Sequence, residues 1–272
     1  MKKVIFIGII LYVQKFNRKL SLYIKKGEIM KKFILLGLIS SLALAQTIKL
    51  ACDNELKYPL TKVAKEFKKQ SGIDVEIIAD SENYLIKKIK NNNSQNYDLF
   101  VPSTFHLISK NNSLFTSQKL IGYNKPVIVI KKGNPKKVKS LDDFERGDVI
   151  VVLAKPAISS IGKTAKDILT KYKNASFAKT IYQKAIQVPT THEINKYINK
   201  NLADASINWK TTVYQNDNQK TLSFIDIPYI APKQKLVLVE LKKAPHPKLA
   251  HKFLTFMAKS KNKLMLKKLG LK

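Results

Sequence analysis

The feature that most constrains the fold is the alternation of strand-like and helix-like runs after residue 46. Short apolar runs alternate with longer runs whose apolar residues recur every three or four positions. This order is typical of α/β folds, in which helices cover largely parallel sheets. The predicted strands are residues 47–52, 73–79, 97–101, 127–130, 149–153, 205–209, 222–227 and 236–239, and the predicted helices are 58–70, 83–90, 159–172, 192–199 and 248–259.

The chain begins with two successive leader-like segments. From Met30 the sequence has two lysines, an apolar stretch and the residues Ala43 and Ala45, which form an A-x-A cleavage site. This pattern predicts a secretory signal peptide over residues 30–45 and a periplasmic, soluble mature chain. Residues 1–13 are also basic and then apolar, so one leader is superfluous. We expect translation to start at Met30, with an N-terminal membrane anchor as the alternative.

The charge of the chain is strongly basic. The formal net charge is +31, and about +23 remains without residues 1–45. Such a charge can attract nucleic acid or an anionic membrane surface. However, the lysines are scattered, Arg146 is the only arginine after Arg18, and no motif combines basic and aromatic residues. We therefore predict a solvated lysine surface and no nucleic-acid partner, with an exported polyanion-binding protein as an alternative.

The sequence offers no recognisable catalytic set. It has no glycine-rich phosphate loop, nucleophile elbow or paired-histidine metal motif. Cys52 is the only cysteine, so an intramolecular disulfide is impossible, and its place in a strand-like run predicts a buried side chain. We therefore expect a binding protein without a resident cofactor or metal, and not an enzyme.

Three strand-to-helix junctions are candidate ligand-binding segments. At Ser159 and Ser160 a helix begins directly after a predicted strand, and free backbone N–H groups at a helix N-terminus favour an anion. Simple helix capping by serine is the alternative. Residues 53–57 and 80–83 form two further junctions, which would meet the same cleft because ligands bind at the carboxyl ends of parallel strands.

An ordered set of segments carries a resemblance to a known family. The segments are IKLAC at 48–52, KEFKKQSGIDVEI at 65–77, YDLFVPS at 97–103, PVIVIKKGNP at 126–135, KSLDDF at 139–144 and ADASINWK at 203–210. Together they resemble the periplasmic molybdate-binding protein family. The resemblance implies a type II, two-lobe α/β fold with a mostly parallel sheet in each lobe. Lobe I would comprise residues 46–125 plus 228–272, and lobe II residues 126–227.

The same resemblance implies a function and partners. A monomer would capture molybdate or tungstate between its lobes and present this oxyanion to the permease of an ABC importer. Proteins similar to this hold the oxyanion with neutral donors, namely serines, backbone amides and a tyrosine. On the second lobe the amide donors correspond to Ile161 and a position near Thr191, and the tyrosine falls on Trp209, which keeps an N–H donor.

The first lobe departs from the family pattern. Its two serines align with Glu55 and Glu82, whose neighbours are Asn54 and Ser81. An ionised carboxylate cannot donate and repels a dianion. Either Asn54 and Ser81 supply the donors while the glutamates face solvent as ordinary loop carboxylates, or the pocket has changed its ligand. In the second case, two inward glutamates favour a cation or an amine-bearing solute.

Overall fold

The computed structural model describes residues 47–91, 96–227 and 231–272. The predicted leader, residues 1–45, lies outside the described residues. Residues Thr47–Lys272 form one compact unit. Across the described ranges, no helix is both long and apolar enough to cross a membrane.

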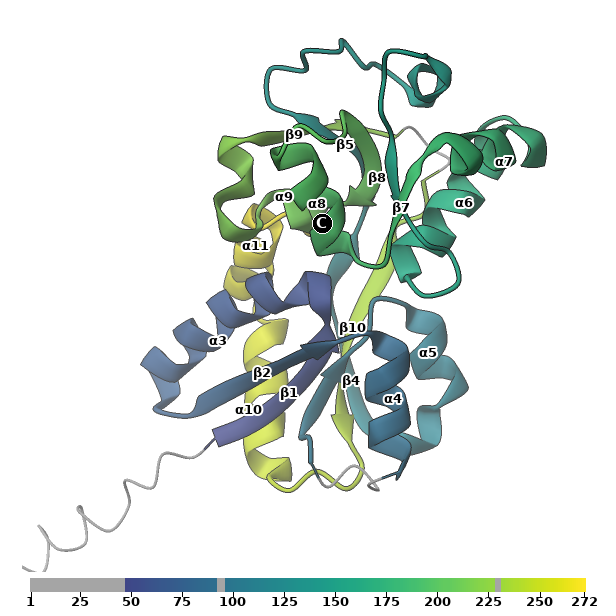
Figure 1. Ribbon diagram of the computed structural model, residues 1–272. Coiled ribbons are helices and arrows are strands. Elements are labelled where there is room, and N and C mark those ends of the chain that lie inside the picture. Colours follow the sequence, from purple (N-terminus) through teal and green to yellow (C-terminus); the bar gives the residue numbers. More distant parts are fainter. Residues whose placement is uncertain (1–46, 92–95, 228–230) are drawn as a thin grey trace, which may run out of the picture. The chain divides into compact units, whose positions relative to one another are not determined.

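The first lobe is built on a five-stranded sheet of order β2-β1-β3-β10-β4. Strand β1 pairs in parallel with β2 and β3, whereas β10 is antiparallel to β3 and β4. Figure 1 shows helices on both sides of this sheet. The strands are β1 (Thr47–Asp53), β2 (Asp74–Asp80), β3 (Leu99–Val101), β4 (Phe115–Asn124) and β10 (Gln234–Leu241), and the helices are α3 (Lys57–Ser71), α4 (Glu82–Asn91), α5 (Phe105–Lys110), α10 (Pro247–Ala258) and α11 (Ser260–Lys268).

The side-chain alternation of β1 explains how this sheet is covered. Ile48, Leu50 and Cys52 point to one face, where they join a cluster with residues of α3, α10 and α11. Ala51 points to the opposite face, where it joins a cluster with residues of α4 and α5. A strand buried on both faces reads as a continuous apolar run, which is the pattern of residues 50–52, whereas Lys49 before them is exposed. Cys52 is fully buried, as predicted.

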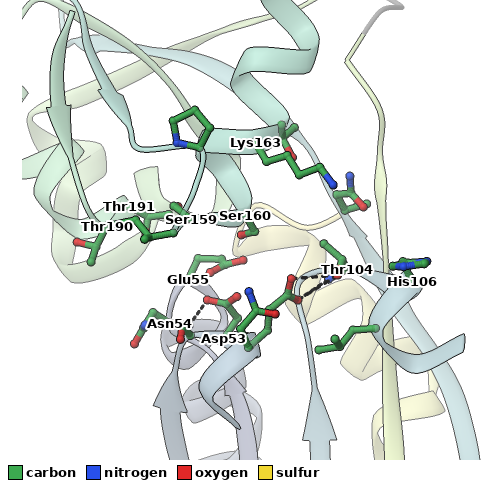
Figure 2. A pocket seen from close by; sticks show the side chains of 18 of the residues that line it. Asp53, Asn54, Glu55, Thr104, His106, Ser159, Ser160, Lys163, Thr190 and Thr191 are labelled. Atoms are coloured by element: carbon green, nitrogen blue, oxygen red, sulfur yellow. Dashed lines mark hydrogen bonds between the residues drawn. The ribbon is translucent and has the colours of Figure 1, made fainter. Parts of the chain in front are cut away.

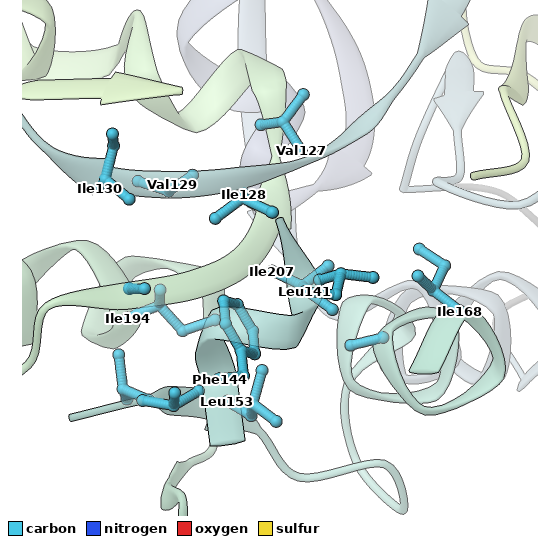
Figure 3. Close-up of a cluster of buried hydrophobic side chains, with 14 of the residues drawn as sticks. Val127, Ile128, Val129, Ile130, Leu141, Phe144, Leu153, Ile168, Ile194 and Ile207 are labelled. Carbon is cyan, nitrogen blue, oxygen red and sulfur yellow. The ribbon is translucent and has the colours of Figure 1, made fainter. Parts of the chain in front are cut away.

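The second lobe has two smaller sheets. The antiparallel sheet has the order β8-β5-β9, and the parallel pair is β6 with β7. One large apolar cluster joins them to the surrounding helices, and Figure 3 shows part of it, with Ile128, Leu141 and Ile207 among its members. The strands are β5 (Pro126–Lys131), β6 (Val152–Ala154), β7 (Ile186–Val188), β8 (Ala205–Trp209) and β9 (Leu222–Asp226), and the helices are α6 (Ser160–Tyr172), α7 (Ala175–Lys184), α8 (Thr191–Asn199) and α9 (Lys210–Val213).

Side-chain hydrogen bonds connect the two lobes near the points where the chain crosses between them. The amide of Asn124, at the end of β4, donates to the hydroxyl of Thr211 in α9 over 3.2 Å. The amide of Gln215 donates to the backbone carbonyl of Glu55 over 2.6 Å. Gln215 begins a 3-10 turn, η4 (Gln215–Lys220), and Glu55 lies in another, η1 (Asn54–Leu56). The carbonyl of Glu55 is therefore tied to the second lobe.

The α/β class is confirmed, but the pairing of the strands differs from the prediction. The five-stranded sheet of the first lobe is mixed, because β10 is antiparallel to β3. The three-stranded sheet of the second lobe is antiparallel. Alternating strands and helices indicate the class, whereas direction depends on which strands become neighbours. The predicted lobe limits stay a prediction, because Thr47–Lys272 is one compact unit.

Candidate functional site

A cavity of about 730 Å³ lies between the strand-to-helix junctions of the first lobe and two helix starts of the second. The first lobe contributes residues that follow β1, β2 and β3, and the second lobe contributes the starts of α6 and α8. Figure 2 shows Ser159, Ser160 and Thr191 on one side of it and Asp53 and Glu55 on the other. The three junctions that the sequence indicated therefore meet at one cavity.

Parallel pairing of β1 with β2 brings two of these junctions together. Asp53 and Asp80, the last residues of the two strands, are direct partners in the register. Each carboxylate accepts the N–H of the following residue, Asn54 or Ser81, over 2.7 Å. These bonds turn the chain out of the strand and place Glu55 and Glu82 just beyond it.

Glu55 is buried in the floor of the cavity. Its side chain is 1% exposed, and its Oε1 accepts a short hydrogen bond from the hydroxyl of Ser103. No donor among the described residues reaches its second oxygen, Oε2. Burial, and next the negative charge of Asp53, raise the pKa of Glu55 well above its ordinary value. A protonated Glu55 carboxyl can donate a hydrogen bond, and the carboxylate of Asp53, with which its side chain hydrogen-bonds, is an acceptor for it.

Glu82 is held from one side by Thr104. The backbone N–H of Thr104 donates to Oε2 over 3.0 Å, and the threonine hydroxyl lies 3.0 and 3.2 Å from the two carboxyl oxygens. Burial, followed by the charge of Asp53, raises the pKa of Glu82 to about 7. Within the described part of the chain, neither glutamate forms an ion pair with a lysine, arginine or histidine.

The opposite wall is the N-terminal end of α6. Ser159 is the N-cap residue of α6, but its side chain makes no capping hydrogen bond, so its hydroxyl does not satisfy the N–H groups at the start of the helix. Ser159, Ser160 and Lys163 line the cavity. Helix α7 holds the start of α6 in place, because the hydroxyl of its Tyr182 donates to the carbonyl of Gly162 over 2.8 Å. The wall thus combines free helix N–H groups, hydroxyls and one ammonium group.

Gly162 sets how closely α6 approaches β6. A Cβ atom at this position would lie 2.6 Å from the carbonyl oxygen of Ala154 and from backbone atoms of Lys155. We expect Gly162→Ala to lower the free energy of unfolding by about 2 kcal/mol, because backbone atoms must move to relieve the overlap. Urea unfolding measures the loss, with Gly147→Ala as the control because a Cβ atom at residue 147 would have open space within 4 Å. Equal effects of the two substitutions would contradict this interpretation.

The start of α8 completes the wall. The hydroxyl of Thr190 accepts the N–H of Glu193 over 3.3 Å and closes a capping box. The carbonyl of Thr191 accepts the buried amide of Asn208 over 3.1 Å, and this amide also donates to Asn195 over 3.0 Å. Buried asparagines therefore fix the helix start at which Thr190 and Thr191 meet the cavity.

The structure brings together five of the seven predicted site residues. Glu55 and Glu82 are buried rather than solvent-exposed, so the interpretation as ordinary loop carboxylates is wrong. Ile161 and Trp209 are not among the lining residues, and both side chains lie in the apolar cluster of the second lobe. The backbone amide donor predicted at Ile161 does not depend on the side chain and stays a prediction. Trp209 pairs with Pro126 at the end of β8, and no partner among the described residues reaches its buried Nε1. The predicted residues that line the cavity are Asn54, Glu55, Ser81, Glu82 and Thr191.

Sequence reasoning missed several residues of the site. Ser103 and Thr104 follow β3 and hold the two glutamates, and Lys163 and Thr190 line the second-lobe wall. The signal for the first pair was present, because Pro102 directly follows a predicted strand. The carboxyl end of that strand reaches the same edge of the sheet as β1 and β2.

A comparison with protein families identifies the chain. Residues 48–272 match the family described as bacterial extracellular solute-binding protein. The chain belongs to this family. Proteins of this family bind solutes outside the cytoplasm, and membership therefore gives this protein an extracytoplasmic location. None of the curated proteins matches it.

Solved structures share the fold of this solute-binding protein at low sequence identity. The periplasmic molybdate-binding protein of Azotobacter vinelandii is 17% identical with a TM-score of 0.69, covering 83% of this chain and 98% of its own. The sulfate-binding protein SubI of Mycobacterium tuberculosis is 14% identical with a TM-score of 0.70, covering 83% and 86%. PEB3, a Campylobacter jejuni protein, in its L-phospholactate complex is 18% identical with a TM-score of 0.67, covering 82% and 98%.

Proposed function

We propose that this protein captures a small solute with an anionic group in the cavity and presents it to the permease of an ABC importer. The observation that carries the proposal is the second-lobe wall, where α6 and α8 direct their N-termini, with adjacent hydroxyls, at one cavity. Helix N-termini favour anions through free N–H groups and the helix dipole. Structural relatives named for molybdate, sulfate and L-phospholactate support this choice of charge.

Molybdate and tungstate are the specific oxyanions that the sequence resemblance suggests. Binding of these oxyanions depends on the protonation state of the first-lobe wall, since Glu55 and Glu82 stand where neutral donors were expected. Protonated, these carboxyls donate hydrogen bonds and add no charge; ionised, they repel a dianion. We propose that a bare oxyanion binds in this cavity below about pH 7, where Glu82 carries its proton.

The second candidate function is binding of a solute with a cationic group, and one observation favours it. Both glutamates line the cavity, and neither has a basic partner among the described side chains. A solute with a cationic group would supply that partner. This candidate keeps the fold, the cavity and the delivery to a permease, and alters only what the first lobe recognises.

Isothermal titration of the purified protein at pH 6 with molybdate, tungstate, sulfate and phosphate tests the anion proposal. We expect saturable binding of at least one of these anions, because Glu82, whose pKa is about 7, is then mostly protonated. If none binds at pH 6 or at pH 8, and an organic phosphate also fails, the proposed anionic group is wrong.

Ser160→Asp tests where the anion lies. Ser160 is the first residue of α6, so an aspartate there suits the helix dipole and keeps the fold while it adds a negative charge to the cavity. We expect about a tenfold loss of affinity for the anion that binds best, which corresponds to ~1.4 kcal/mol. Ser113→Asp, at an exposed position, is the control. Unchanged affinity in Ser160→Asp would place the anion elsewhere.

A further inference from the structure

The two walls of the cavity are chemically different. The second-lobe wall offers hydroxyls, free helix N–H groups and the ammonium of Lys163 at the start of α6, with the carboxylate of Asp167 further along this helix. The first-lobe wall offers the carboxyls of Asp53, Glu55 and Glu82 at the strand ends, and Lys233 and Lys235 line the cavity at the start of β10. A solute that spans from the helix starts to the strand ends meets donors at one end and a group of carboxyls at the other.

The carboxyl wall has unused capacity for a donor. Glu55 is 1% exposed, it lines the cavity, and no N–H or hydroxyl donor among the described residues reaches its Oε2. Its side chain hydrogen-bonds with the carboxyl of Asp53, which requires a proton on one of the two groups. Buried polar atoms in folded proteins nearly always have a hydrogen-bond partner, so a donor on the ligand can take the place of this shared proton.

Asp53 acts on both glutamates. After burial, which is the larger cause, its negative charge raises the pKa of Glu55 and of Glu82. Lys163, Lys233, Lys235 and His106 line the same cavity, but none of these four described residues forms an ion pair with the carboxyls. A positive charge placed among the three would remove the repulsion.

The arrangement suits an organic cation better than a metal ion. No group of three histidine, cysteine, aspartate or glutamate residues within the described ranges has the geometry to hold a metal. The cavity of about 730 Å³ falls in the ~300–1,000 Å³ range of pockets that enclose small organic molecules. A protonated amine supplies several N–H donors to separate carboxyls and needs no fixed coordination geometry.

We propose that the solute is amphoteric: it carries an anionic group that binds at the N-termini of α6 and α8, and a protonated nitrogen that binds among Asp53, Glu55 and Glu82. This inference rests on the proposed function and names the class of solute. When it is ionised, the Glu55 carboxylate accepts one N–H of the ammonium group, and Glu82 accepts another while it keeps its bonds from Thr104.

Three matched probes test this inference by calorimetry at pH 8: O-phosphoethanolamine, ethyl phosphate and ethanolamine. The first has both charges, the second only the anion and the third only the cation. We expect O-phosphoethanolamine to bind at least tenfold more tightly than ethyl phosphate, and ethanolamine to bind more weakly than O-phosphoethanolamine. The Glu55→Gln/Glu82→Gln double variant should lose this preference, whereas a Glu66→Gln/Glu76→Gln control should keep it. Circular dichroism verifies that each variant folds, and the Glu82→Gln single variant replaces the double variant if the latter does not.

The outcomes separate this inference from the function on which it rests. If ethyl phosphate binds the wild-type protein as tightly as O-phosphoethanolamine, the amphoteric solute is wrong while the anion site stands. An amine preference that survives in the glutamine variants also overturns the inference, because the carboxyls then do not recognise the nitrogen. If neither phosphate binds, and the inorganic anions fail at pH 6, the proposed function and the inference fail together.

Discussion

Replacing Glu82 with glutamine is expected to raise the free energy of unfolding by about 3 kcal/mol at pH 8 and to change it little at pH 4. The pKa of Glu82 in the folded protein is about 7, above the ordinary value of 4.5. As the pH rises between these values, the unfolded chain loses its proton first, so the folded state loses stability until about pH 7. Each pK unit corresponds to ~1.4 kcal/mol, so the full cost is about 3 kcal/mol. Glutamine is neutral at every pH and therefore avoids this loss of stability.

Glutamine also preserves the local hydrogen bonds, so the comparison isolates charge. Its carbonyl oxygen can accept the N–H of Thr104, and its amide can donate to the hydroxyl of Thr104, which replaces the present contacts of 3.0 Å. Urea unfolding at pH 4, 6 and 8 measures the difference, with the exposed Glu76→Gln as control. A stability gain that is the same at all three pH values would show that the charge of Glu82 is not its cause.

Sulfate affinity is expected to fall by about 30-fold between pH 6 and pH 8.5. A bare dianion prefers the protonated Glu82, so its affinity falls about tenfold for each pH unit above 7. Sulfate is a suitable probe because its own charge is constant over this range. The raised pKa of Glu55 acts in the same direction. The other charged or titratable groups that line the cavity are Asp53, Asp80, Asp167, His106, Lys163, Lys233 and Lys235.

Two comparisons assign this pH dependence to the glutamates. In Glu82→Gln the decline should become shallower, because one of the titrating groups is gone. For O-phosphoethanolamine we expect no such decline, since an ionised Glu82 attracts the ammonium group while it repels the anion. Calorimetric titration in buffers of constant ionic strength gives both profiles. An unaltered sulfate profile in Glu82→Gln would assign the dependence to another group.

Much of the fold could be predicted because local pattern and tertiary structure agree. Gly72 adopts a φ of 72° and ends the predicted helix α3, and a capping box formed by Ser140 and Asp143 opens the 3-10 helix Leu141–Glu145. In contrast, β4 and α5 were missed, because the alternation over Phe115–Asn124 is weak and α5 has only six residues. Strand direction was also wrong for β10, since its neighbours β3 and β4 are distant in sequence.

The position of the site could be predicted, but its chemistry could not. Strand ends and a helix start indicated that residues near Asn54, Ser81 and Ser159 would meet, the family resemblance added Thr191, and all four line one cavity. Whether Glu55 and Glu82 face solvent depends on Ser103 and Thr104, which lie about 50 and 20 positions away and leave no pattern in the local sequence. Trp209 was misplaced for the same reason, because pairing of β8 with β5 directs its ring into the apolar cluster.

Glu55 has two roles, because its backbone carbonyl accepts the hydrogen bond from the side-chain amide of Gln215. Its side chain faces the cavity, while its backbone holds the 3-10 turn η4 of the other lobe. A hinge rotation that widened the cavity on this side would have to break that 2.6 Å bond. The side chain that a solute meets and the carbonyl that holds the second lobe therefore belong to one residue, so a displacement of Glu55 on binding would act directly on η4.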